Sequence, residues 1–380
     1  MRLLQVTVLA FHAVSVVEAA TKVSWTLHKS CYRKVKDTDE NGKKIPEDEL
    51  FDKELADAIK SVNDAKAWAK RAASKITLST LPGVGQITGL PTKLAIAPLV
   101  GGLENYNTAA KEIRDRFNKI AEMEGPVGSD GDKLGRFGQS RAWIDLGNSD
   151  KHFNDFLSLA PFDAMSPARI ITCRPEIVTV PDPAGGPFDK PYDVVRKYHM
   201  FQPHTLEKFI EQENSEEIGG DWEKVPTPRT MAITQRDAPP TGGRKRIAES
   251  INFHPLWIKF QRSKNFGGWI EDDFTEVTKP DALEDFKSKG AAKTPPVDTR
   301  PMEGLLSKSL TANMLHEFFH LSYFGNMLDA PNAYGWMNNV KNNDRENPDL
   351  YAIIGAVIEL MSRDGQKYSV SVEGEVSPMP

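Results

Sequence analysis

The stretch that decides the fold, residues 309–325, reads SLTANMLHEFFHLSYFG. Its apolar residues recur at the three- and four-residue spacing of a helix that packs into a core. Gly325 then suits the left-handed turn that ends such a helix. Within the stretch, His316 and His320 lie four residues apart, which places both imidazoles on one helical face with Glu317 beside them. This arrangement favours a helix that binds a metal ion over an exposed helix with two polar residues, because dense apolar flanks would bury both rings.

The acid between the two imidazoles predicts hydrolytic chemistry. On such a helix His316 and His320 can direct ring nitrogens at one Zn²⁺, while Glu317, about a third of a turn away, flanks the ion without binding it. A carboxylate in that place can take a proton from metal-bound water. A catalytic zinc site needs a third protein ligand and an open position for the water.

The third zinc ligand has three alternatives in the sequence. A third His six residues past His320, after a Gly at the third position, is excluded because Tyr and Asn occupy positions 323 and 326. Two acids further along the chain are alternatives, Glu346 and Glu359. Asp329, nine residues past His320, fits best, because a helix that ends and turns back can deliver its carboxylate to the same ion.

The segments around this motif resemble the aspzincins, the deuterolysin-like and peptidyl-Lys metalloendopeptidases. In that family a Gly-Thr-x-Asp-x-x-Tyr-Gly segment follows the helical motif, and the next helix opens with a sequence like Asn-Ala-Asp-x-Tyr. Here Asp329 precedes Tyr334-Gly335, and residues 347–352 read Asn-Pro-Asp-Leu-Tyr-Ala. The chain departs from the pattern where Asn326-Met327 replaces Gly-Thr and where four residues, instead of two, separate Asp329 from the Tyr. The resemblance is confined to roughly residues 310–360.

The resemblance implies a zincin-like catalytic domain and a role for each matching residue. One Zn²⁺ would be held by two His and one Asp, which correspond to His316, His320 and Asp329. Glu317 would be the general base, and Tyr334 would donate a hydrogen bond to the oxyanion. Asp349 would line the pocket for the residue after the cleaved bond. The residues themselves also allow a turn role for Asp329, a core role for Tyr334 and a helix-start charge at Asp349.

The N-terminus predicts secretion. A basic start at Met1-Arg2, an apolar run and small residues before Ala20 are typical of a signal peptide that ends near residue 19, and a buried strand or helix is the alternative. No later stretch is apolar enough to anchor the chain in a membrane. In an extracellular protein the two cysteines, Cys31 and Cys173, most simply form one disulfide bond.

Composition limits the partners. The chain has 380 residues, of which 27% are charged, and a net charge of −5. It has no strong basic stripe, which argues against a nucleic acid partner. The aspzincin resemblance implies a peptide or protein substrate, and we expect a monomer.

The spacing of apolar residues and the positions of Gly and Pro predict an α+β fold. Helices are expected at 47–76, at 109–123, at 309–325 and from Asn347 onward; strands are expected within 168–180 and 251–260; irregular connections are expected at 80–102, 225–244 and 279–301. The Gly-rich stretch 125–138 is the best boundary. It separates a helical N-terminal region, 20–130, either a prosegment or a separate helical domain, from a catalytic domain, 139–365, and a tail, 366–380.

The leading hypothesis from the sequence is a secreted zinc endopeptidase. Two alternatives stay open. One is a secreted binding or effector protein that retains a metalloprotease-like fold without turnover, and the other is a zinc hydrolase that acts on something other than peptides.

Overall fold

The structure is a computed structural model that describes most of the chain from residue 24 onward. It describes residues 24–27, 31, 47–83, 87–123, 168–175, 177–180, 190–193, 198–199, 204–226, 229–236, 249–264, 266, 268–294, 296–329 and 333–380. The predicted signal peptide and the Gly-rich boundary at 125–138 lie outside these residues. The described part mixes helices and strands and is mainly helical, so the α+β expectation is confirmed.

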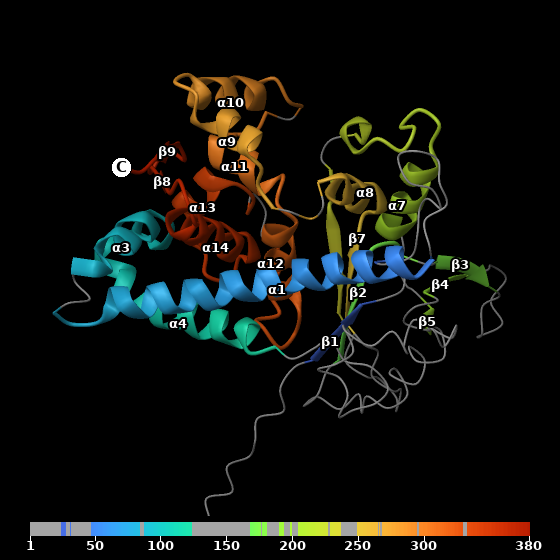
Figure 1. Cartoon of the computed structure of the whole chain (residues 1–380), viewed down its shortest axis with the longest axis horizontal. Coiled ribbons are helices and arrows are strands. Elements are labelled where there is room, and N and C mark those ends of the chain that lie inside the picture. The colour runs from blue at the N-terminus through green and yellow to red at the C-terminus, as the bar shows by residue number, and fades with distance from the viewer. Residues whose placement is uncertain are drawn as a thin grey trace, which may run out of the picture.

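The elements follow one another along the chain as labelled in Figure 1. The α-helices are α1 (Glu47–Thr80), α3 (Leu90–Ile96), α4 (Leu103–Ala121), α7 (His204–Asn214), α8 (Pro255–Ser263), α9 (Glu271–Thr278), α10 (Ala282–Ala291), α11 (Pro301–Leu306), α12 (Leu310–His320), α13 (Trp336–Asn342) and α14 (Pro348–Ser362). Short 3₁₀ helices are η2 (Ala97–Val100) and η4 (Trp222–Lys224). The strands are β1 (Ser24–Leu27), β2 (Ala168–Thr172), β3 (Ile177–Val180), β4 (Lys190–Asp193), β5 (Tyr198–His199), β6 (Ala232–Gln235), β7 (Glu249–Phe253), β8 (Tyr368–Val370) and β9 (Val376–Pro378).

The main sheet has the strand order β1-β2-β7-β6. The first three strands run parallel, and β6 pairs antiparallel with β7 at the edge of the sheet as described. All residues of β7 are buried, as expected for an inner strand covered on both faces. The predicted disulfide bond is confirmed, because Cys31 and Cys173 are joined where the chain leaves β1 and β2. This bond ties the N-terminal strand to the rest of the sheet.

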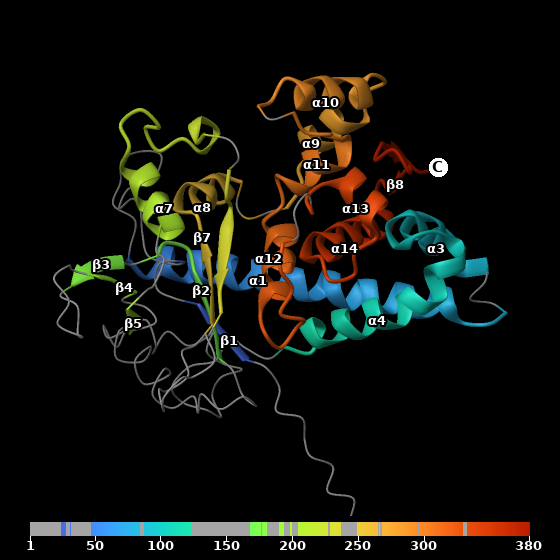
Figure 2. The same cartoon turned by 180° about the vertical axis from the view of Figure 1, so that it is seen from behind.

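The N-terminal helices share a core with the metal-motif helix. In Figures 1 and 2 the long helix α1 runs across the molecule and lies along α4, α12 and α14. Phe117 of α4 packs against Phe319 of α12 and Tyr351 of α14, with ring centroids 5.8 and 5.6 Å away. Phe319 and Tyr351 are themselves 4.1 Å apart. The helical N-terminal region is therefore packed into the same core as the motif; its role as a prosegment stays a prediction.

Helices α12 and α14 begin where the sequence predicts. Ser309 caps α12 by accepting a hydrogen bond from Ala312 N, at 3.1 Å, and Asn347 caps α14 by accepting one from Asp349 N, also at 3.1 Å. The predicted end of α12 is wrong, since this helix stops at His320 and not near residue 325. Its chain reversal uses Asn326, which has a left-handed φ of 55°.

Four other expectations from the sequence need correction. The stretch 225–244, expected to be irregular, contains the strand β6. The stretch 251–260 is the end of β7 followed by α8, because His254 caps the helix and Pro255 begins it. The connection at 80–102 contains the helix α3, which also starts next to a Pro. The stretch 279–301, expected to be irregular, contains α10. For α8 and α3, the Pro in the first turn of the helix reads in the sequence as a sign of a strand or a loop.

None of the helices in the described part of the chain is long and apolar enough to cross a membrane.

Candidate metal centre

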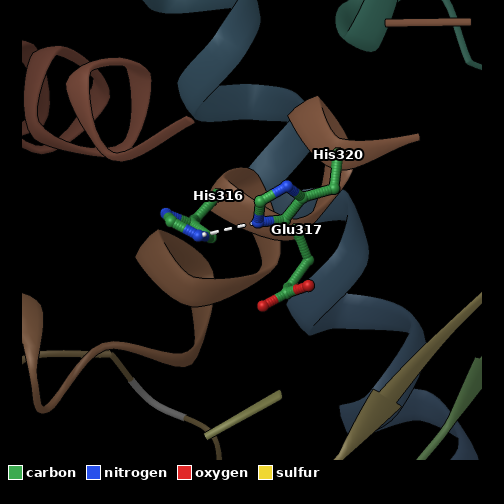
Figure 3. A group of neighbouring side chains, drawn as sticks. All are labelled: His316, Glu317 and His320. Carbon is green, nitrogen blue, oxygen red and sulfur yellow. Dashed lines mark hydrogen bonds between the residues drawn. The ribbon is translucent and has the colours of Figure 1, made fainter. Parts of the chain in front are cut away.

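The last turn of α12 and the segment that follows it bring three predicted ligands together. Nε2 of His316 lies 3.1 Å from Nε2 of His320, as Figure 3 shows. The two oxygens of Asp329 face these nitrogens, at 3.4 Å from His316 and 3.5 Å from His320. Both histidines are buried, whereas the Asp329 side chain is 37% exposed. The carboxylate therefore closes the site on the side that faces solvent.

The spacing of these atoms suits a small tetrahedral ion. Zinc bonds to His nitrogen and carboxylate oxygen are about 2.0–2.2 Å long, so two such ligands at the tetrahedral angle lie about 3.3–3.5 Å apart. The three separations of 3.1, 3.4 and 3.5 Å are close to this value. A nitrogen of each His and an oxygen of Glu317 also lie within 4.8 Å of one another. The group could hold a metal ion without rearrangement of the helix.

The polar group at the far side of each imidazole ring determines which ring nitrogen faces the site. Nδ1 of His320 lies 2.9 Å from the carbonyl oxygen of Met327. A carbonyl only accepts, so Nδ1 carries the proton and Nε2 of the neutral ring keeps its lone pair for a metal. Nδ1 of His316 faces Asp349 Oδ1 at 3.8 Å, beyond direct hydrogen-bond distance. The carboxylate still favours a proton on that nitrogen, which leaves Nε2 to the site.

Glu317 is held beside the two rings by a strand far away in the sequence. Its carboxylate accepts a hydrogen bond from the Thr234 hydroxyl of β6, with an oxygen–oxygen distance of 2.6 Å. Glu317 is only 6% exposed, so this bond supplies part of the solvation that burial removes. Figure 3 shows its carboxylate directed away from the helix axis and next to the imidazole pair. It occupies the position expected of a proton acceptor beside a metal.

Tyr334 lies at the open side of the centre. Its ring stacks on His316, with centroids 5.7 Å apart and planes 19° from parallel, and it is 55% exposed. Its hydroxyl is hydrogen-bonded to Asp329. Burial of the hydroxyl and this bond to a carboxylate raise the pKa of Tyr334, so the group is a donor at every physiological pH. The phenol is available to a molecule that enters beside Asp329.

Asp349 lies on the Nδ1 side of His316, and its side chain is 14% exposed. One of its oxygens accepts from Gly335 N and from Asn339 Nδ2, both at 2.9 Å, and the other faces His316. Asn347 adds a bond to the Ala333 carbonyl at 2.8 Å. These bonds connect the start of α14 to the segment that carries Tyr334. The predicted contact of Asp349 with substrate stays a prediction; the partners described here are all groups of the protein.

The carboxylates give the centre a negative potential. Burial lowers the pKa of His316, but its hydrogen bond with Asp329 and the charges of Glu317 and Asp349 outweigh burial, so the pKa is raised overall. Burial alone would raise the pKa of Asp329, but His316, together with Tyr334 and His320, lowers it to about 2. Three acids around two imidazoles are a favourable environment for a divalent cation.

The other acids considered as third ligands lie elsewhere. Glu346 forms an ion pair with Arg116 of α4, at 2.5 Å, and Glu359 forms one with Arg71 of α1. Both acids therefore connect the N-terminal helices to the C-terminal half. Among the described acids, Asp329 is the one that faces both imidazoles.

Several groups that complete the centre have no recognisable signature in the sequence. Thr234, Met327 and Asn339 act through a hydroxyl, a backbone carbonyl and an amide. None of these has a characteristic spacing from the His motif. The sequence identifies Asp349 as a candidate but does not indicate its contacts with Gly335 and with Asn339 of α13.

Comparison of the chain with protein-family models, with curated proteins and with solved structures found no match.

Proposed function

We propose that the protein is a secreted zinc-dependent endopeptidase of aspzincin type. The observation that carries the proposal is the convergence of His316 Nε2, His320 Nε2 and the Asp329 carboxylate at 3.1–3.5 Å. Two imidazoles and one carboxylate form a donor set that suits zinc, and the separations match its bond lengths. The zincin-like fold and the secreted location are parts of the same proposal.

The chain's own residues supply the remaining chemistry. When bound, zinc polarises a carbonyl and lowers the pKa of a coordinated water. Glu317, held by Thr234, accepts the proton of the attacking water and passes it to the leaving amine. Tyr334 donates a hydrogen bond from its hydroxyl to the oxygen that gains negative charge in the transition state. For this, its hydroxyl turns from Asp329 toward the substrate.

The position of β6 supports a peptide as the substrate. This strand is at the edge of the sheet as described, and its Thr234 contacts Glu317 directly. An extended peptide can add to the edge of a sheet as a further strand. A peptide bound there would pass next to the base and the two imidazoles. The aspzincin resemblance around Asp329 and Asn347 supports the same reaction.

The test compares Glu317→Gln with a matched control, Glu346→Gln. Glu346 is 63% exposed and pairs with Arg116 away from the centre. Each protein is analysed for zinc by mass spectrometry and for cleavage of casein. We expect zinc in all three proteins and a loss of activity of about 10²–10⁴-fold in Glu317→Gln alone.

Two outcomes would contradict the proposal. Full activity of Glu317→Gln would remove the base from the mechanism. A zinc-loaded wild-type chain that cleaves neither casein nor a mixed peptide library would favour a binding protein that retains the metal centre without turnover.

A further inference from the structure

One end of the molecule exposes a cluster of aliphatic side chains. It lies around the C-terminal end of α1, the helix α3 and the start of α4, which Figures 1 and 2 show together at one extreme of the long axis, and it includes two residues between α1 and α3. The exposed side chains, named here the aliphatic tip, are Leu78 (42%), Leu81 (46%), Ile87 (79%), Leu90 (45%), Leu94 (51%) and Leu103 (47%). They are half of the twelve exposed large hydrophobic residues found across the described chain. The cluster is therefore not the usual scatter of single apolar residues.

The side chains of the aliphatic tip do not belong to the hydrophobic core. In α3, Thr92 and Ile96 are buried, whereas Leu90 and Leu94, one turn apart, both face solvent. The helix thus buries one face and presents a second apolar face outward. Apolar surface kept in water is unfavourable, and contiguous patches of it on a folded protein indicate an interaction site.

The charge of the same segment narrows the choice of partner. Residues 65–103 contain five Lys or Arg and no Asp or Glu. The whole chain has 53 acids in 380 residues, so about five would be expected in these 39 positions. The segment has a charge of +5 in a chain of net charge −5. Lys70 and Lys75 are exposed on α1, eight and three residues before Leu78 of the aliphatic tip.

We propose that the aliphatic tip inserts into the surface of an anionic lipid bilayer, with Lys70 and Lys75 against the headgroups. Aliphatic side chains gain from entering the boundary between headgroups and acyl chains, and neighbouring lysines gain from anionic lipids. A bilayer needs no matching surface shape, so a protruding end of this kind suits it. Carboxylates would be repelled there; residues 65–103 have none, and the first one after them is the exposed Glu104 beside Leu103.

A second copy of the chain is a less suitable partner. A symmetric dimer through this end would bring two segments of charge +5 together. Like charges at such an interface oppose association.

Membrane contact through this end is separable from the proposed hydrolysis. The aliphatic tip includes no residue of the metal centre, and α12 lies near the middle of the molecule in Figure 1. No described helix is long and apolar enough to cross a membrane, so the contact is peripheral. Its effect would be to hold the metal centre close to a lipid surface.

The experiment measures co-sedimentation of the full mature chain with vesicles. The vesicles are made of phosphatidylcholine alone or of phosphatidylcholine mixed with phosphatidylglycerol. The variants are Leu90→Ser/Leu94→Ser and Lys70→Gln/Lys75→Gln. The matched control is Ile270→Ser/Val297→Ser, which changes two residues of similar exposure, 41% and 46%, outside the aliphatic tip. Circular dichroism checks that each protein is folded, and light scattering reports its oligomeric state.

We expect wild type and the control to bind the anionic vesicles and to bind neutral ones weakly. The leucine pair should reduce the partition coefficient roughly hundredfold, and the lysine pair should reduce it roughly thirtyfold. Absence of wild-type binding to anionic vesicles would overturn the proposal. Undiminished binding of the folded leucine variant would also overturn it, as would a wild-type dimer that this variant converts to a monomer.

Discussion

Gly355→Ala is expected to disturb the contact that supports the metal-binding helix. A Cβ added at Gly355 of α14 would lie 2.6 Å from Cδ2 of Leu315 and 3.8 Å from Cε3 of Trp68. Carbon atoms in contact are normally about 3.5–4.0 Å apart, so Leu315 would have to move by about 1 Å. Leu315 is fully buried and directly precedes His316. The space left by this glycine therefore allows α14 to pack closely under the centre.

The magnitude follows from two opposing effects. Overpacking a core costs about 1–3 kcal/mol, while replacing Gly by Ala inside a helix gains about 1 kcal/mol. We expect a net loss of about 1 kcal/mol in the free energy of unfolding for Gly355→Ala. Leu315→Ala should cost about 2–5 kcal/mol through the cavity it leaves. In the double variant the added methyl group fills part of that cavity, so its loss should be at least about 1 kcal/mol smaller than the sum.

The assay is urea unfolding followed by tryptophan fluorescence for the two single variants and the double variant. Ser74→Ala, an exposed change on α1, is the control and should shift the free energy by less than about 0.5 kcal/mol. Additive losses, within about 0.5 kcal/mol, would show that the two residues are not in contact. A stabilising Gly355→Ala would contradict the packing of α14 against α12.

Three further predictions concern the disulfide bond, a buried histidine and the proposed base. Cys31→Ser/Cys173→Ser opens a loop with a sequence separation of 142 and should lower the free energy of unfolding in urea by up to about 5 kcal/mol; an unchanged midpoint would contradict this. Burial lowers the pKa of His254 to about 4, so the fold holds the neutral ring, and the stability present above the ordinary value of 6.5 is lost as the pH falls from there through 4. The loss should reach about 3 kcal/mol, and His254→Asn, which can still cap α8, should show a weaker acid dependence in thermal unfolding at pH 4–7; an identical dependence would exclude the ring as its source. Thr234→Val removes the donor to Glu317 and should reduce kcat on casein by roughly tenfold with zinc content unchanged; a kcat equal to wild type would remove this bond from the mechanism.

Features that depend on local spacing were predicted best. A four-residue separation on a helix is enough to place His316 and His320 side by side, because helix geometry is set by the chain itself. The start of α14 follows for the same reason, since Asn347 and Pro348 act within one turn. Periodicity does not predict the exact end of α12, because Glu249 and Arg236, distant in the sequence, hold the segment after His320 through Ser322 and Asn326.

Features that depend on distant parts of the chain were not predictable. Thr234 and Glu317 lie 83 residues apart and meet only because β6 packs beside α12. Phe117 comes from a helix that appeared separate in the sequence, yet it contacts Phe319 in the shared core. The ion pairs of Glu346 and Glu359 also join distant parts of the chain, since each arginine partner lies in an N-terminal helix. Spacing along the chain does not encode such contacts.

The central claim is that Asp329, with His316 and His320, holds one zinc ion. The most direct test is the zinc content per chain, measured by mass spectrometry after dialysis, for wild type and for Asp329→Ala, Glu346→Ala and Glu359→Ala. We expect about one zinc in wild type and in both glutamate variants, and almost none in Asp329→Ala. Zinc retained at the wild-type level in a folded Asp329→Ala, or lost on removal of Glu359 instead, would contradict the account.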